Sequence, residues 1–317
     1  MYKEEAEIGV GTSMKYLGLT LDSHWTFRAH FEATENALGN LLPRLDGPGV
    51  GVRRQYAGVV RSRFLYGAPI WAEDLMASRR SHLKVRRLHR TVDIRVVRGF
   101  PTISAVAAAV LVGFPPFELQ ALWCREIYLH TRGLREGVNP VGADVESGAR
   151  RALLDRWRVS LHMRAGAPEL RVLEVVLPNW DVWLEGASPP SPPHPLTNRV
   201  TQVLTGHGCF GEYLHRSRKE ATARCHHWDV SVDSAQHTLE FCPAWAWPRR
   251  DLIAALLASE RGRRAVTSFC EQVMLRKEAA ERARVRSSHS ERIDWRGAAD
   301  AAGTLGQDAQ GPPLRCW

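Results

Sequence analysis

The chain has 317 residues, of which 44% are hydrophobic, and this is enough to bury the core of more than one structural unit. It carries 43 Lys and Arg residues against 34 Asp and Glu residues, and the resulting net charge of +9 favours RNA, DNA or an acidic protein as partner. The longest apolar run, 105–114, is about ten residues long. A membrane-spanning helix needs roughly twice that length, so we expect no membrane partner.

The cysteines indicate a reducing environment. There are six of them, at positions 124, 209, 225, 242, 270 and 316, without the dense, regular spacing of a disulfide framework. The first residues, MYKEEAEIGVGTS, also lack the basic and then apolar layout of a secretory signal. We therefore expect an intracellular protein, in nucleus or cytoplasm, whose cysteines are thiols or metal ligands.

The N-terminal part of the chain predicts one strand followed by helices. Residues 15–22, KYLGLTLD, are short and alternating, which is typical of a strand or one arm of a hairpin. Apolar residues then recur at helical spacing over 26–45, 52–71, 79–98, 103–112 and 117–132. We expect residues 1–25 to form a strand region and residues 26–135 to form a helical bundle.

The C-terminal part predicts further helices separated by a linker. Periodicity fades over 133–148, and residues 136–186 are expected to be a connecting region with helices over 150–164 and 170–184. Residues 187–195 contain SPPSPPHP, whose prolines cannot donate backbone hydrogen bonds, so this segment is predicted to be a linker. A small module over 196–286, with helices at 249–257 and 262–286, precedes a tail at 287–317 that we expect to be disordered.

The helix expected at 79–98 is strongly basic. Between Ser78 and Arg98 there are eight basic residues and a single acid, Asp93. A solvated surface helix normally mixes acids and bases, whereas like charges are neutralised by a polyanion. An apolar stripe on the other side would face the core. We therefore predict phosphate contacts from this helix by Arg79, Arg80, Lys84, Arg86, Arg87 and Arg90.

Residues 225–242 have the spacing of metal ligands. A small zinc knuckle takes two ligands from a C-x2-C turn and two more from a later H-x4-C segment. Cys225, His237 and Cys242 match three of these positions, but Trp228 stands where the second cysteine is expected. An indole ring does not bind zinc.

Several alternatives for the fourth position remain open. The candidate ligands are His227, the neighbouring His226, and Cys209 from the preceding loop. The alternative is a knuckle-shaped fold without metal, held together by the packing of three tryptophans, Trp228, Trp245 and Trp247. In either case the basic residues just before the knuckle are expected to contact nucleic acid, namely Arg216, Arg218 and Lys219.

Three blocks of the sequence resemble a known family. They are KYLGLTLDSHWTFRAHFE at 15–32, YAGVVRSRFLYGAPIWAEDL at 56–75, and LTGHGCFGEYLHR at 204–216 with the cysteines and CPAWA that follow. In this order they resemble the C-terminal third of the reverse transcriptase polyproteins of arthropod non-LTR retrotransposons. The resemblance implies that the first block ends the palm, that the next helices are thumb-like, and that the knuckle handles template RNA or target DNA.

One departure bears on catalysis. Polymerase chemistry requires clustered aspartates that hold two magnesium ions, and this sequence contains no adjacent Asp-Asp pair. We therefore expect a noncatalytic C-terminal fragment of an RNA-directed DNA polymerase, which binds nucleic acid and has zinc as a possible cofactor. The alternatives are a domesticated protein-interaction module that docks through the helix at 262–286, and a pseudogene product with no selected activity.

The predicted fold class is mainly α. It combines a helical thumb-like bundle and one short N-terminal strand or hairpin with a small knuckle-like module and flanking helices.

Overall fold

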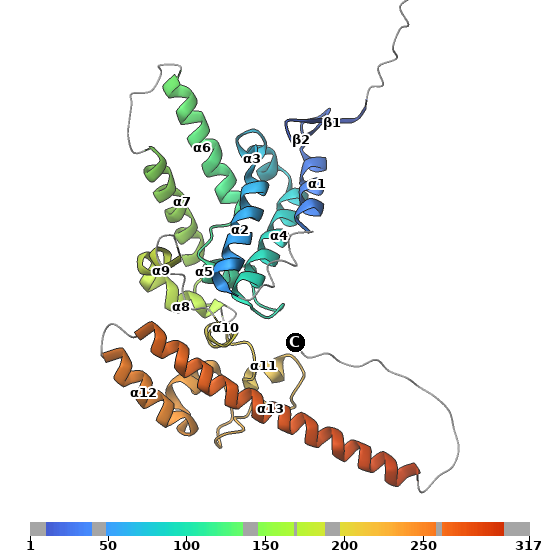
Figure 1. Cartoon of the computed structure of the whole chain (residues 1–317), viewed down its shortest axis with the longest axis vertical. Helices are drawn as coiled ribbons and strands as arrows, with labels where there is room; N and C mark the ends of the chain where they lie inside the picture. The colour runs from blue at the N-terminus through green and yellow to red at the C-terminus, as the bar shows by residue number, and fades with distance from the viewer. Residues whose placement is uncertain are drawn as a thin grey trace, which may run out of the picture.

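The structure of the chain, a computed structural model, describes residues 11–39, 49–135, 145–167, 170–187, 197–257 and 262–300. It is mainly helical with a two-stranded hairpin at its start, as predicted (Figure 1). The strands are β1 Ser13–Tyr16 and β2 Leu19–Asp22. The helices are α1 Arg28–Gly39, α2 Val50–Leu65, α3 Ala68–Ala77, α4 Arg79–Val97, α5 Ala105–Val112, α6 Phe117–Arg135, α7 Val145–His162, α8 Val172–Val176, η3 Leu177–Asn179, α9 Trp180–Ala187, α10 Asn198–Thr205, α11 Gly211–Arg216, η4 His237–Phe241, η5 Pro243–Trp245, α12 Ala246–Leu257 and α13 Gly262–Asp300.

The segment predicted as a strand at 15–22 belongs to a complete hairpin. β1 and β2 pair antiparallel, with Ser13 opposite Asp22 and Tyr16 opposite Leu19. The chain turns at Gly18, whose φ of 85° is a conformation that glycine adopts without strain. Leu19 is the buried residue of the hairpin and anchors it on the helices below.

The single helix predicted at 52–71 is in fact two helices, α2 and α3. Gly67 has a φ of 70°, and Pro69 stands in the first turn of α3, where its missing N–H is not needed. A Cβ atom on Gly67 would lie only 2.7 Å from Cδ2 of Leu19. The prediction was wrong because the apolar spacing continues across the break and hides it.

An aromatic cluster joins α1, α2, α3 and α6. The fully buried ring of Trp71 makes edge contacts with Phe31 and Phe64, with centroids 5.3 Å away in both cases. Phe64 also stacks on Phe117 at 4.9 Å. These helices pack around α4, whose apolar stripe of Val85, Leu88, Val92 and Val96 is buried as expected.

The region after α6 also differs from the prediction in its details. The expected helix at 170–184 is broken into α8, η3 and α9, with Pro178 in the first turn of η3. Trp180 at the start of α9 packs edge-on against Trp157 of α7 at 5.0 Å. Trp183 donates its indole N–H to the carbonyl oxygen of Val110 at 2.8 Å, which ties α9 to α5.

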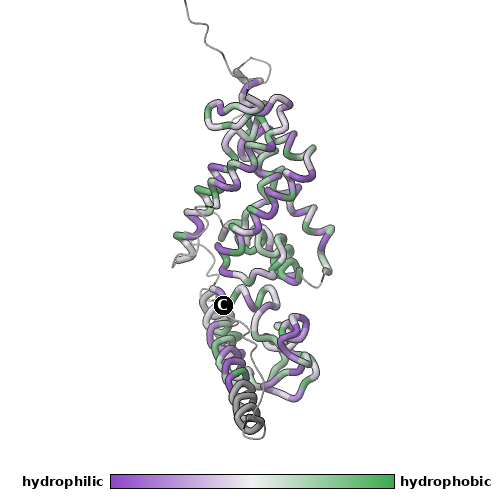
Figure 2. The backbone as a smooth tube through the Cα atoms, turned by 90° about the vertical axis from the view of Figure 1, so that its right-hand side faces the viewer, coloured by the Kyte–Doolittle hydropathy of each residue, from purple (hydrophilic) through white to green (hydrophobic). Residues whose placement is uncertain are grey.

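Helices α10 to α13 form the C-terminal part and contact the end of α4. Thr201 donates its hydroxyl to the carbonyl oxygen of Val97 at 2.8 Å, and Asn198 donates its side-chain amide to that of Arg98 at 2.7 Å. Helices α12 and α13 lie side by side in this part (Figure 1). Along most helices of the molecule hydrophilic and hydrophobic residues alternate, as amphipathic helices require (Figure 2).

The C-terminal tail and the proline-rich segment were both predicted to lack regular structure. The tail was predicted to be disordered from 287 onward, but α13 continues to Asp300, so this prediction was wrong for 287–300. No proline or glycine interrupts residues 287–295, so the sequence gives no signal that ends the helix there. The remaining part of the predicted tail, 301–317, and the prolines of the predicted linker lie outside the described residues.

Within the described ranges, no single helix is long and apolar enough to cross a membrane. The cysteines at positions 124, 209, 225, 242 and 270 are free thiols, and Cys316 lies outside the described part of the chain.

Candidate metal centre

Two short segments bring Cys225, His237 and Cys242 together. The backbone N–H of Cys225 donates to the carbonyl oxygen of Val230 at 3.0 Å, which closes the loop that follows the first cysteine. His237 and Cys242 stand at the two ends of the π-helical turn η4, and the N–H of Cys242 donates to the carbonyl oxygen of His237 at 2.7 Å. The H-x4-C spacing thus corresponds to one tight turn.

The three side chains have the geometry of metal ligands. Their ligand atoms all lie within 4.8 Å of one another, and all three residues are buried. The Sγ atoms of Cys225 and Cys242 are 3.9 Å apart, whereas a disulfide requires about 2.05 Å. Two thiolates bound to one tetrahedral zinc at about 2.3 Å would be separated by about 3.8 Å. The observed separation of the sulfur atoms therefore fits a shared metal ion.

The imidazole of His237 supports the same interpretation. Its Nε2 atom is buried and has no hydrogen-bond partner within the described structure. Such a buried polar atom is costly unless a donor or a metal ion satisfies its lone pair. Burial also lowers the pKa of His237, which keeps the ring in the neutral form that a metal binds.

The protonation of Cys242 sets a condition for metal binding. Burial raises the pKa of its thiol to about 11, so the free site holds a proton on this sulfur near neutral pH. A metal ion would displace this proton and bind the thiolate. Arg249 supports the turn by donating to the carbonyl oxygens of Cys242 at 2.8 Å and Leu239 at 2.7 Å.

The candidates for a fourth ligand lie outside this cluster. The ring of His227 packs edge-on against Trp245, with centroids 4.8 Å apart. His226 is exposed, with its Nε2 atom 3.7 Å from Glu220, and Cys209 is half-buried with a pKa raised to about 11 by burial. Among the described residues only Cys225, His237 and Cys242 form such a group, and they would supply three of the four ligands of a tetrahedral metal ion.

A buried ion pair, which the sequence analysis did not identify, lies behind this site. Lys277 of α13 donates to both carboxylate oxygens of Asp233, at 2.8 and 2.6 Å. The same carboxylate accepts from the hydroxyl of Thr238 at 3.2 Å and from the backbone N–H of Gly211 at 3.1 Å. Lys277 stands three and four residues after Met274 and Val273, so helical spacing alone indicated burial. Its partner Asp233 could not be found from the sequence.

Gly211 allows the chain to come close to this pair. A Cβ atom at position 211 would lie 2.6 Å from the carbonyl oxygens of both Ala223 and Arg224. These two residues directly precede Cys225. The glycine in the LTGHGCFGEYLHR block therefore lets α11 pack directly against the backbone that carries the first ligand.

The predicted phosphate contacts of α4 fall into two groups. Lys84 pairs with Glu32 of α1 at 2.7 Å, and Arg86 pairs with Glu118 of α6 at 3.0 Å. Arg90 donates to the backbone carbonyls of Pro101 and Ile103. The side chains of Arg79, Arg80 and Arg87 are exposed, and none of them forms an ion pair within the described structure.

Asp93, the single acid of α4, is buried in the core beside His89. Asp93 and His89, one turn apart, are both buried, with Nε2 and Oδ2 3.2 Å apart but without the alignment of a hydrogen bond. Burial raises the pKa of Asp93 and lowers that of His89 to about 4. Both groups are therefore held toward their neutral forms in the core.

The basic residues before the knuckle are all on the surface. Arg216, Arg218 and Lys219 are exposed and follow one another at the end of α11. Arg216 lies over the ring of Tyr213 with its Cζ atom 5.6 Å from the centroid. They lie on the same short module as the Cys–His cluster.

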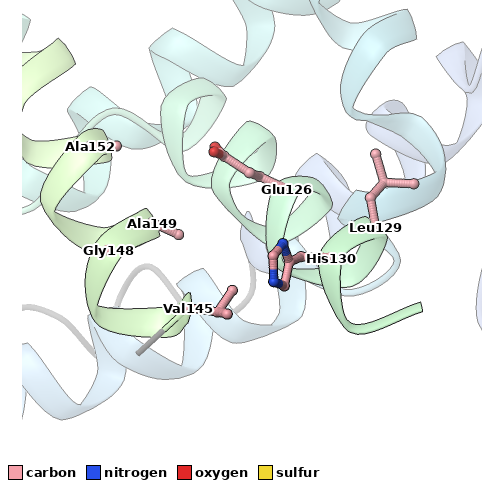
Figure 3. A pocket seen from close by; sticks show the side chains of 7 residues that line it. All are labelled: Glu126, Leu129, His130, Val145, Gly148, Ala149 and Ala152. Atoms are coloured by element: carbon pink, nitrogen blue, oxygen red, sulfur yellow. The ribbon is translucent and has the colours of Figure 1, made fainter. Parts of the chain in front are cut away.

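A hollow lies between α6 and α7 (Figure 3). Its volume is about 510 Å³, and its α7 side is formed by small residues, among them Gly148 and Ala149. Glu126 and His130 contribute from α6. The hollow contains none of the residues predicted to bind metal or nucleic acid.

The chain is thus a mainly helical protein with a buried Cys–His–Cys cluster and exposed arginines. It is 26% identical over 309 residues to the 115 kDa protein of the type-1 retrotransposable element R1DM of Drosophila melanogaster, covering 84% of this chain and 28% of the relative. It is also 27% identical to the Pol polyprotein of an R1 element of Bradysia coprophila, and the alignment covers 75% of this chain and 24% of that relative. The Pol polyprotein of an R1 element of Nasonia vitripennis is 28% identical, over 76% of this chain and 63% of that relative.

These relatives confirm the predicted resemblance to arthropod retrotransposon polyproteins. The chain spans about a quarter of the length of two of them and 63% of the third. No protein-family model matches the chain, and no solved structure matches it.

Proposed function

We propose that this chain is a nucleic-acid-binding part of an R1-type retrotransposon polyprotein, and that Cys225, His237 and Cys242 hold a zinc ion in it. The observation that carries the proposal is the buried cluster, whose sulfur atoms are 3.9 Å apart beside an imidazole nitrogen without a partner. When bound, zinc would fix the loop after Cys225 to the turn η4 and hold both cysteines as thiolates.

The charge on the surface supports nucleic acid as the partner. Arg79, Arg80 and Arg87 stand on the first half of α4, and none of them lies within ion-pair distance of a described acid. Arg216, Arg218 and Lys219 add a second basic group beside the knuckle. Exposed cations that are not neutralised within the protein attract phosphate groups and release counterions on binding.

We further propose that the chain itself binds nucleic acid without polymerising it. The catalysis of nucleotide addition requires carboxylates that hold two metal ions, and the sequence contains no adjacent Asp-Asp pair. The apolar side of the helix at 262–286, the alternative docking surface, is buried within the fold through Phe269, Cys270, Val273 and Met274. Nucleic acid is therefore the partner that we propose.

Fluorescence anisotropy with labelled single-stranded RNA and duplex DNA tests this function. We expect affinity to fall steeply between about 50 and 200 mM salt, because binding releases counterions from the phosphates. The double variant Arg79→Glu/Arg87→Glu should bind more weakly, and its salt slope for single strands should be smaller by about 1.4, or about 0.7 for each lost phosphate contact.

The matched control is Arg151→Glu/Arg164→Glu, which changes the net charge by the same amount at two exposed arginines outside α4. This variant should bind nearly as well as the wild type. Equal losses in the two double variants would show that only total charge matters, and salt-independent binding would refute phosphate contact.

Zinc is tested separately by metal analysis of protein purified without added chelator. We expect one zinc per chain in the wild type and less in Cys242→Ser, which keeps the size of the side chain but replaces the thiolate. A wild-type protein free of metal in the presence of excess zinc would refute the site.

A further inference from the structure

The tryptophans near the cluster differ in their environment. Trp245 is buried, with 3% of its surface exposed, whereas Trp228 and Trp247 are 53% and 71% exposed. Arg250 covers the ring of Trp247 at 4.7 Å. Among the described residues the indole ring of Trp228 makes no stacking or cation–π contact. The packing of all three tryptophans, which the metal-free alternative required, is therefore not observed.

Trp228 faces a hollow in the surface beside the metal centre. The hollow has a volume of about 520 Å³ and is lined by Thr222 and residues 224–229. Its loop is held by backbone hydrogen bonds from Val230 to Trp228 at 2.8 Å and from Asp233 to Ala223 at 2.7 Å. The loop around the hollow is therefore fixed by its own backbone hydrogen bonds, and Trp228 is among the residues that line the hollow.

The charges around the hollow favour an anionic ligand. Arg224 on its wall pairs with Asp229 at 2.5 Å, but these side chains are 62% and 88% exposed. An ion pair with such exposure contributes little stability, so the guanidinium can exchange its carboxylate for a phosphate at small cost. Between positions 216 and 230 the chain has four basic residues and two acidic ones.

We propose that this hollow is a stacking subsite for one unpaired nucleobase, which lies on the ring of Trp228 while its phosphate contacts Arg224. Aromatic rings beside cationic groups are the general means by which proteins bind single-stranded nucleic acid, since every base has a flat face. The imidazoles of His226 and His227 on the same wall can hydrogen-bond to the base edge. Paired bases in a duplex are already stacked and cannot enter. The subsite rests on the proposed function and specifies its ligand.

The experiment compares Trp228→Ala with Trp247→Ala in the full chain. Trp247 is the matched control, because it is also an exposed tryptophan of the same module but does not line the hollow. We expect Trp228→Ala to weaken binding of single-stranded RNA about tenfold, as the loss of one stacked base does, and Trp247→Ala to leave it nearly unchanged. Trp228→Phe should restore most of the affinity, because phenylalanine also stacks.

Two further ligands identify the source of the effect. Single-stranded RNA and DNA of the same length distinguish the two chemical sources of an unpaired base, and an oligonucleotide with abasic sites keeps the phosphates but removes the stacking partner. Wild type and Trp228→Ala should bind the abasic strand and duplex DNA equally well.

The outcomes separate this proposal from the function on which it rests. If Trp228→Ala binds single strands as tightly as the wild type while Arg79→Glu/Arg87→Glu binds weakly, the stacking subsite is refuted and the nucleic-acid function stands. If the wild type binds no nucleic acid at low salt, both are refuted. An equal loss for abasic and normal strands would also overturn stacking, because it would locate the effect in the phosphates.

Discussion

At the level of single residues, Trp228 determines both properties of the knuckle. A cysteine at this position would complete the C-x2-C pair and a tetrahedral ligand set, whereas tryptophan leaves one position open and places a ring on the surface. The sequence therefore allowed the three ligands to be predicted from their spacing. It could not indicate the exposure of Trp228, because exposure depends on which loops pack around it.

Restoring the missing ligand is the first prediction. We expect Trp228→Cys to bind zinc at least about tenfold more tightly than the wild type, because a thiolate adds a fourth strong ligand to the other three. Competition with a chromophoric chelator measures this affinity. Trp228→Ser is the control, since it removes the indole ring without adding a strong ligand. Equal affinities of the cysteine and serine variants would show that position 228 cannot reach the metal.

The pair of His89 and Asp93 gives a prediction about pH. Between about pH 4 and 6.5 the unfolded chain binds a proton on His89 that the folded chain does not. Through this group the free energy of unfolding therefore decreases as the pH falls. Asp93 acts in the opposite direction, because its raised pKa makes the folded chain hold a proton that the unfolded chain has released. In the wild type the two effects oppose each other in this range. The charge of Glu118 raises the pKa of His89, but burial has the larger effect and lowers it.

Asp93→Asn separates these effects. With only His89 left, the free energy of unfolding should rise by about 1.4 kcal/mol for each pH unit between about pH 4 and 6.5, more steeply than in the wild type, where Asp93 opposes the rise. In the wild type, the proton that folded Asp93 keeps opposes this rise, and in the variant nothing at position 93 titrates. Urea unfolding across the pH range measures both slopes, and parallel profiles would contradict the assignment.

At the level of helices, α13 depends on its contact with the knuckle. Lys277 and Asp233, both 2% exposed, connect the two. We expect Lys277→Met to destabilise the protein by about 3–5 kcal/mol, because it leaves a buried carboxylate without its counter-charge. Asp233→Asn in the same chain removes that charge and should recover much of the loss, while its amide oxygen still accepts from Gly211. Chemical denaturation of the single and double variants measures the coupling, and additive losses would disprove it.

Helix positions could be predicted wherever an apolar stripe and a clear end coincide. The bounds of α4 follow from Ser78, whose side chain accepts from the N–H of Ser81, and from Arg98 in the left-handed conformation. The breaks at Gly67 and Pro178 were missed because apolar residues continue on both sides of them. Tertiary contacts, such as the close approach of Leu19 to Gly67, explain the first break, and periodicity does not record them.

The partners of the basic helix could not be predicted for a similar reason. Glu32 and Glu118 neutralise Lys84 and Arg86 from α1 and α6, which are distant in the sequence. The charge count of a single segment therefore overstates the number of cations that are free for phosphate. Which arginines remain exposed becomes clear only when the helices are packed.

At the level of the whole molecule, the exposed basic residues form two groups. One is on the first half of α4 (Arg79, Arg80 and Arg87), and the other lies before the knuckle (Arg216, Arg218 and Lys219). Arg79 begins the helix, and α10 of the C-terminal part contacts its other end through Val97 and Arg98. The helix has 19 residues and is therefore about 28 Å long. A stacked nucleic acid strand that runs from Arg79 to the far end of α4 spans about this distance, which corresponds to about eight nucleotides at 3.4 Å each.

The affinity should therefore depend on oligonucleotide length in two stages. Stacked strands shorter than about eight nucleotides cannot reach from Arg79 to the end of α4, whereas longer strands can engage Arg79 and the knuckle group together and gain from the high effective concentration of the second contact. Anisotropy with single strands of increasing length should show a rise in affinity beyond this point, larger than the gradual increase due to added binding positions. Arg79→Glu/Arg87→Glu, which leaves Arg80 as the only cation of the α4 group and reverses two charges beside it, should lose this rise and keep the gradual increase. The same rise in both proteins would mean that the strand does not follow α4.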